Sequence, residues 1–217
     1  YNILTLHLFL FVILFTNKLQ MADILPYLLS AFIGIGLAAA SGFRVFLPMF
    51  AVSLASYMGW IPMGDNFEWL SGLPTLITTG AATIVEILAY YIPVVDNFLD
   101  TITIPLATVA GSVLFASQFI ELDTFPQWAL ALIAGGGTAA TIASGFAGTR
   151  AASTATTGGI GNNLVATTET AGAGLMSVLA IFLPVLAFIA AIALLIAVLF
   201  FFCYIWRKMR GYNSESV

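Results

Sequence analysis

The chain has 217 residues, of which 61% are hydrophobic and only 7% are charged, and its formal net charge is −4. A composition this apolar excludes a soluble globular domain and indicates an integral membrane protein. The six basic residues leave no positively charged surface that could bind nucleic acid.

The first part of the chain, residues 1–20, differs from the rest. It holds an apolar run from Ile3 to Phe15 with no basic residue ahead of it, whereas a signal peptide carries positive charge before its apolar core. We interpret residues 1–20 as an upstream extension and Met21 as the native start; a genuine additional helix is the alternative. On the first interpretation the one histidine, His7, is not native, which removes the commonest general base and metal ligand.

Long apolar segments follow, and their lack of strict alternation favours helices over a β-barrel. They cover residues 24–40, 45–61, 73–92, 102–119, 128–146, 164–183 and 185–206. We therefore expect an all-α fold, a polytopic helical membrane protein of about six to eight membrane segments. Basic residues follow the last segment and predict a cytoplasmic C-terminus under the positive-inside rule: Arg207, Lys208 and Arg210.

Two sequence patterns occur twice, in the same order. The sequence ASGFR at 40–44 returns as ASGF at 143–146 with Arg150 close behind, and LAYYIPV at 88–94 returns as LAIFLPV at 179–185. This predicts two internal repeats, a way in which membrane proteins build a site at the join. The expected division is repeat one at 21–119, a linker at 120–127, repeat two at 128–206 and a cytoplasmic tail at 207–217.

The second segment of each repeat is unusual for a membrane helix. In repeat one it is residues 43–61, interrupted by Pro48, and in repeat two it is residues 147–163, rich in Thr, Gly and Asn. Irregular or polar backbone at membrane depth is tolerated only beside protein or a water-filled cavity. If both segments are broken or re-entrant, each repeat crosses three times and the repeats are inverted, the arrangement we favour; if both cross fully, the halves are parallel.

Prolines and glycines supply further structural signals. Pro93 and Pro184 occupy equivalent places in the two repeats and predict breaks between successive helices. Glycines are dense in the apolar segments and predict faces where helices approach closely; they include Gly34, Gly36, Gly135, Gly136, Gly137, Gly172 and Gly174.

Few ionisable residues lie inside the apolar segments. Glu86 is the one charged residue in the run 75–91, and Arg44 and Arg150 are the basic residues between Met21 and Trp206. A charge at that depth costs roughly 2.5–3.5 kcal/mol, so each should face a partner or a cavity. The arginines could grip an anionic group, neutralise the acids, or extend to the membrane interface.

A second acidic group follows Pro93. On a helix, Asp96 and Asp100 share a face with Asn97 beside them, an arrangement that can bind a cation or a shared proton. The alternative is that these acids complement a helix N-terminus at the water interface. We interpret Glu169 as lying near the start of its helix and facing water, and rank it below Glu86.

Two stretches together resemble a known family: SGFRVFLPMF at 41–50 and VVDNFLDTITIPLA at 94–107. They are similar to DUF4126, a family of small bacterial integral-membrane proteins catalogued as a domain of unknown function. The resemblance implies a location in the bacterial inner membrane and brings no established activity. The positions that match the family are Arg44, Pro48, Asp96, Asn97, Asp100 and Pro105.

The leading functional hypothesis is a small transporter or channel-like permease, coupled to protons or a cation, with its site between the repeats. Candidate residues for the substrate or ion pathway are Arg44, Glu86, Asp96, Asn97, Asp100 and Arg150. We expect no catalytic residue, no cofactor and no metal; the partners are the lipid bilayer, a small solute or ion, and a second copy in a homodimer. The alternatives are a non-catalytic scaffold or accessory subunit and, least favoured, an intramembrane lipid enzyme.

Overall fold

The computed structural model describes residues 24–214, so the expectations for residues 1–20 and for Met21 fall outside the described residues. Within this range a few side chains are not described, at positions 93, 94, 96–98, 100, 205, 206 and 208–214.

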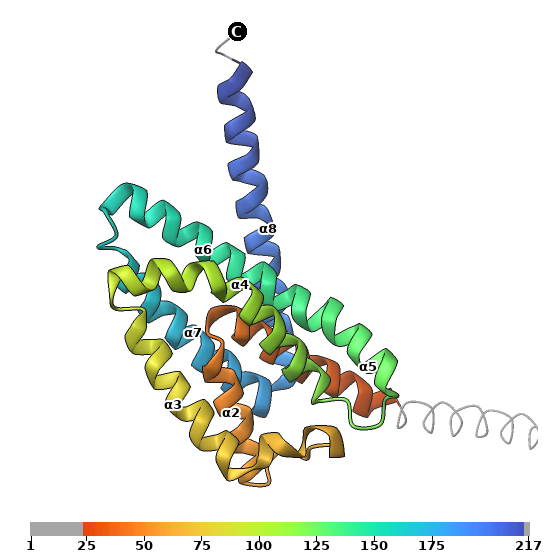
Figure 1. Cartoon of the computed structure of the whole chain (residues 1–217). Helices are drawn as coiled ribbons and strands as arrows, with labels where there is room; N and C mark the ends of the chain where they lie inside the picture. Colours follow the sequence, from red (N-terminus) through yellow and green to blue (C-terminus); the bar gives the residue numbers. More distant parts are fainter. Residues whose placement is uncertain (1–23, 215–217) are drawn as a thin grey trace, which may run out of the picture.

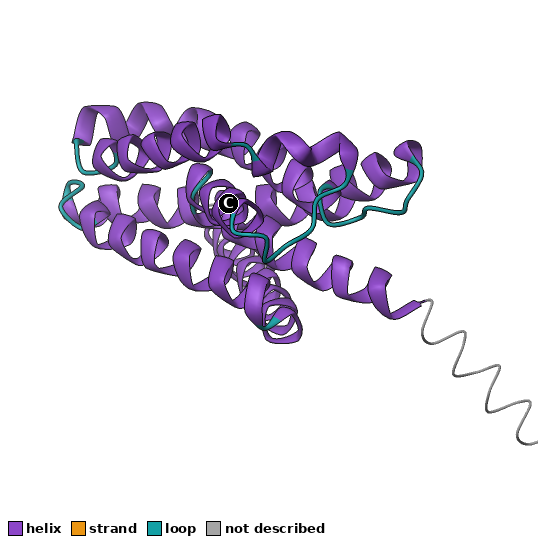
Figure 2. Ribbon diagram, turned by 90° about the horizontal axis from the view of Figure 1, so that it is seen from below, coloured by secondary structure: helices purple, strands orange, loops and turns teal. Residues whose placement is uncertain are grey.

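The described chain is helical and contains no strand between residues 24 and 214, which agrees with the predicted all-α class. Short connections join the helices (Figure 2). The elements are a first helix Ile24–Phe43, α2 Phe46–Tyr57, the 3₁₀ turn η1 Asp65–Ser71, α3 Leu73–Ala89, α4 Pro93–Ala116, α5 Thr124–Leu130, the π-helical turn η2 Ala131–Gly136, α6 Gly137–Thr157, α7 Asn162–Phe182 and α8 Pro184–Ser214.

Four stretches of the described chain are long and apolar enough to cross a membrane: Ile24–Phe43, Thr124–Thr157, Asn162–Phe182 and Pro184–Tyr204. A fifth is obtained if η1 and α3, bent by 60° at their junction, form one span. This is fewer than the six to eight segments expected from the sequence. The 12-residue helix α2 reaches only about 18 Å, short of roughly 30 Å of hydrocarbon.

The two Ser-Gly-Phe motifs have different local structures. The first helix ends at Phe43, Arg44 and Val45 connect it to α2, and the chain is broken at this point. The second motif lies inside α6, which runs without a break to Thr157 and ends at Gly158 in the left-handed conformation (φ 64°). The expectation of a broken or re-entrant segment at 147–163 is therefore wrong for its first eleven residues.

Hydrogen bonding shows how the Thr-rich part of α6 satisfies its polar side chains within the helix. Its hydroxyls donate to carbonyls one turn back in the same helix, as from Thr149 to Gly145 O at 3.0 Å and from Thr157 to Ser153 O at 2.7 Å. These side chains satisfy their own polar groups locally, so low hydrophobicity alone does not break the helix.

The three prolines expected to break the chain occupy helix starts. Pro93 is the first residue of α4 and Pro184 the first of α8, where the missing N–H has no partner to lose. Pro48 does not interrupt its segment, contrary to expectation, because it lies in the first turn of α2. The break falls before it, at Arg44 and Val45.

The two matched motifs contact each other inside the molecule. The rings of Phe43 and Phe146 lie 4.7 Å apart, and a Cβ on Gly42 would fall 2.6 Å from Ile142 Cβ. The end of the first helix therefore packs against the middle of α6. In Figure 1, α8 (blue) leaves this packed body and its C-terminal part projects beyond the other helices.

Several of the glycines lie at close helix contacts, as predicted. A Cβ on Gly34 would meet Phe115 of α4, one on Gly36 would meet Ala180 and Ala187, and one on Gly172 would meet Phe43, each within 2.9 Å. Two glycines of the predicted faces, Gly137 and Gly174, have nothing within 4 Å of a built Cβ.

Two glycines two residues apart, Gly135 in η2 and Gly137 at the start of α6, provide a matched test of this packing. A Cβ on Gly135 would lie 2.6 Å from Phe115 Cβ and 2.7 Å from Gly111 O, so Gly135→Ala should destabilise the protein by about 1–3 kcal/mol. Gly137→Ala meets open space and should be neutral or stabilising by up to about 1 kcal/mol, since alanine favours the helix. Thermal unfolding in detergent measures the stability of both variants. Equal melting temperatures for the two variants would contradict the close packing at Gly135.

Candidate functional site

The break after the first helix is stabilised by a carboxylate from another helix. The first N–H groups of α2 have no carbonyl partner within their own helix. Glu86 of α3 supplies both acceptors: its Oε1 accepts from Val45 N at 2.7 Å and its Oε2 from Phe46 N at 3.0 Å. Glu86 is buried. It therefore caps α2 and ties the broken segment to α3.

Arg44 extends from this break to α7. Its Nε donates to Thr170 Oγ1 at 3.1 Å, and its Nη2 donates to Ala166 O at 2.8 Å. The same Nη2 lies 3.4 Å from Glu169 Oε2. Only 1% of Arg44 is exposed, and its Nη1 has no hydrogen-bond partner among the described residues.

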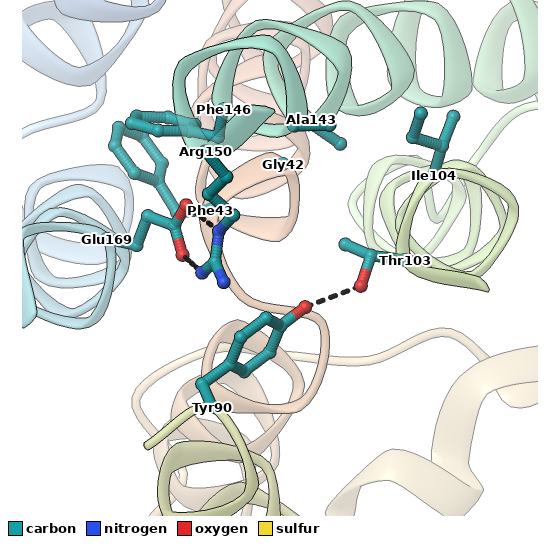
Figure 3. A pocket seen from close by; sticks show the side chains of 10 residues that line it. Gly42, Phe43, Tyr90, Thr103, Ile104, Ala143, Phe146, Arg150 and Glu169 are labelled. Carbon is teal, nitrogen blue, oxygen red and sulfur yellow. Dashed lines mark hydrogen bonds and ion pairs between the residues drawn. The ribbon is translucent and has the colours of Figure 1, made fainter. Parts of the chain in front are cut away.

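Arg150 of α6 approaches the same carboxylate. Its Nε donates to Glu169 Oε1 at 3.0 Å, and its Nη2 pairs with Glu169 Oε2, so the guanidinium and the carboxylate form a two-pronged ion pair (Figure 3). Arg150 and Glu169 are each 2% exposed. Glu169 Oε2 is thus shared by two buried guanidinium groups.

An aromatic ring lies against both cations. The Arg44 and Arg150 guanidinium carbons are 3.8 Å and 4.2 Å from the centroid of the Tyr90 ring, within the range of cation–π attraction. The Tyr90 hydroxyl lies 2.5 Å from Thr103 Oγ1 of α4. Because Thr103 donates its own proton to Leu99 O, the tyrosine is the donor. Figure 3 shows this link beside Arg150.

We call Arg44, Glu86, Tyr90, Arg150 and Glu169 the central cluster. Its two arginines and two glutamates are the buried charged residues among the side chains that the structure describes, and with both acids ionised their formal charges sum to zero. Burying an unpaired charge in a medium of low dielectric constant is strongly unfavourable, whereas a balanced and hydrogen-bonded set is tolerated. Neutrality therefore makes this cluster compatible with a membrane interior.

A small cavity adjoins the cluster. It is lined by Gly42 and Phe43 from the first helix, by Ala143 and Arg150 from α6, and by Glu169, among others. The room for the centres of water molecules is about 10 Å³, enough for about one water. The cluster is closed to anything larger in this conformation.

The structure brings together three of the six pathway residues expected from the sequence: Arg44, Glu86 and Arg150. The others, Asp96, Asn97 and Asp100, lie in the first turns of α4, and their side chains are outside the described set. Among the described residues, no group of three or more His, Cys, Asp or Glu side chains could hold a metal ion.

The sequence reasoning missed Glu169 as a partner of both arginines. It is not at a helix start facing water, because α7 begins seven residues earlier and the side chain is buried. The overlooked signal is its helical face, which it shares at three- and four-residue spacings with small residues that pack inside: Ala166, Ala173, Ser177 and Ala180. Tyr90 was missed as well, since an aromatic residue before a proline carries no distinctive signal.

The fold and the composition define an all-helical membrane protein whose charged residues pair in its interior. The chain belongs to the DUF4126 family, a domain of unknown function, whose model matches residues 31–204, as the resemblance of two motifs suggested. No curated protein and no solved structure matches the chain.

Charge balance in the cluster makes a prediction for paired substitutions. Arg150→Met leaves a net charge of −1 and Glu169→Gln leaves +1, and each should destabilise the protein by about 3–5 kcal/mol. The double variant restores neutrality, so it should unfold at a higher temperature than either single variant. Thermal unfolding of the four proteins in detergent measures the coupling. If the loss of stability in the double variant equals the sum of the losses in the two single variants, the ion pair contributes no mutual stabilisation.

Proposed function

We propose that the protein is a small membrane transporter or permease, not an enzyme, and that its solute passes through the central cluster. The observation that carries this proposal is the convergence of Arg44, Glu86, Arg150 and Glu169 at a break between two helices. Ionisable groups inside a membrane protein usually serve transport or binding, because apolar residues would satisfy packing alone. Discontinuous helices frame the sites of many transporters.

The closed cavity supports a carrier that changes conformation over an open channel. With room for about one water, a solute can enter only if the side chains or helices move. The connection at Arg44 and Val45 is a suitable hinge, since the first helix ends there and α2 begins under the Glu86 cap.

The α6–α7 turn supports an approach from one side. Arg150 lies seven residues before the end of α6, so the cluster is about 10 Å from that end of the helix. Three threonines in that stretch are exposed: Thr154, Thr156 and Thr157. Exposed hydroxyl groups at this end of α6 could also hydrogen-bond to water at an entrance.

A scaffold or accessory role is the second candidate. The C-terminal part of α8 projects beyond the other helices (Figure 1), and apolar side chains exposed on α8 could pack against another membrane protein in place of lipid, among them Ile189, Ile192, Ile196 and Leu199. In that case the central cluster would only hold the helices together.

Solute uptake by proteoliposomes distinguishes the two roles. Osmotic swelling is followed by light scattering with a panel of small neutral, cationic and anionic solutes, against protein-free liposomes. We expect the protein to admit one class of solute, and Arg44→Gln to abolish that uptake. Gly137→Ala, a substitution at an open surface position, should leave the rate unchanged. The proposal fails if no solute enters faster than in protein-free liposomes, or if folded Arg44→Gln matches the parent protein.

A further inference from the structure

Two buried arginines converge on one carboxylate oxygen, and this geometry is that of an anion-binding site. Glu169 Oε2 is paired with Nη2 of Arg150 and lies 3.4 Å from Nη2 of Arg44. Guanidinium groups bind carboxylates and other small anions through the same forked donors. The protein's own glutamate therefore occupies a position that a free anion could take.

Arg44 has donor capacity that the described residues do not use. Its Nη1 is buried and has no hydrogen-bond partner among them, although Nε and Nη2 are both satisfied. A buried donor without an acceptor is unfavourable by about 1–3 kcal/mol, and such groups are uncommon in folded proteins. An additional acceptor beside Arg44 would remove this penalty.

The two glutamates of the cluster differ in their freedom to move. Both oxygens of Glu86 accept backbone N–H groups at the start of α2, so its displacement would uncap that helix. The carboxylate of Glu169 contacts the side chains of Arg44 and Arg150. Glu169 can leave the arginines without disturbing a helix end, provided that something replaces its charge.

The charge balance defines what that replacement must be. Glu169 faces Arg44 from the connection before α2 and Arg150 from α6, and the charge of Glu86 on α3 lies close enough to act on it. Tyr90 and Thr170 contact the arginines themselves. If Glu169 takes up one proton, the cluster acquires a net charge of +1 in a water-poor interior. One monovalent anion restores neutrality. The cavity beside Arg150 and Glu169, with room for about one water, favours a small anion.

We infer that Arg44 and Arg150 form a site for a small monovalent anion, and that Glu169 vacates this site by accepting a proton that travels with the anion. Transport is then electroneutral, with one proton for each anion. This inference rests on the proposed function and names its substrate class and coupling. The proton bound by Glu169 is released when the anion leaves and the carboxylate returns to the two arginines.

Chloride is a suitable probe, tested in proteoliposomes that contain a pH-sensitive dye and compared with protein-free liposomes. With the membrane potential clamped at zero by potassium and valinomycin, an inward chloride gradient should acidify the interior, at one proton per anion taken up. Glu169→Gln, which mimics the protonated residue, should exchange anions without moving protons. Glu68→Gln, the same change at an exposed position in η1, should behave like the parent protein.

The outcomes separate this inference from the proposed function. Uptake of a neutral or cationic solute with no anion-driven acidification overturns the anion site but leaves a transporter. Anion uptake by the parent protein without protons overturns the role of Glu169, whether or not Glu169→Gln folds. If no solute of any class enters, both proposals fail.

Discussion

The structure depends on one electrostatic constraint: charges buried in an apolar helical bundle must be balanced within hydrogen-bonding distance. Glu169 meets that constraint for two cations at once. Arg150 binds its carboxylate through both Nε and Nη2, and Nη2 of Arg44 lies 3.4 Å from Glu169 Oε2. Tyr90 adds an aromatic face to both guanidinium groups. Because these residues come from α3, α6, α7 and the connection before α2, balancing the charges also sets how those elements pack.

The helix break and the charged cluster are two aspects of one arrangement. A chain that stops being helical after Phe43 exposes the N–H groups of Val45 and Phe46, and in an apolar environment these need acceptors. Glu86 provides them from α3, while Arg44, at the same break, is directed to α7. The broken segment is thus tied to two helices by groups of opposite charge. A movement of α3 or α7 would therefore change the contacts made at the break.

Residue types and periodicity predicted the helical class, the membrane setting and that Arg44, Arg150 and Glu86 would each face a partner. They failed where three-dimensional context decides the outcome. The polar stretch after Phe146 is compatible with a helix because its hydroxyls bond within the helix, an effect that hydrophobicity does not show. Glu169 was misjudged because closeness to a helix start suggested exposure, whereas the small residues on its face turn it inward. The two-repeat organisation stays a prediction, although its two Ser-Gly-Phe motifs lie in contact.

The central claim is that Glu169 is an ionised carboxylate shared by two arginines in the resting protein. Infrared difference spectroscopy measures this directly, with carbon-13-labelled glutamate and Glu169→Gln as the reference that assigns the bands. At neutral pH the account predicts that Glu169 contributes the paired stretching bands of a carboxylate, displaced from those of an exposed glutamate by the guanidinium contacts. A carbonyl band of a protonated acid assigned to Glu169 at neutral pH would contradict it, because the cluster would then carry an unbalanced positive charge.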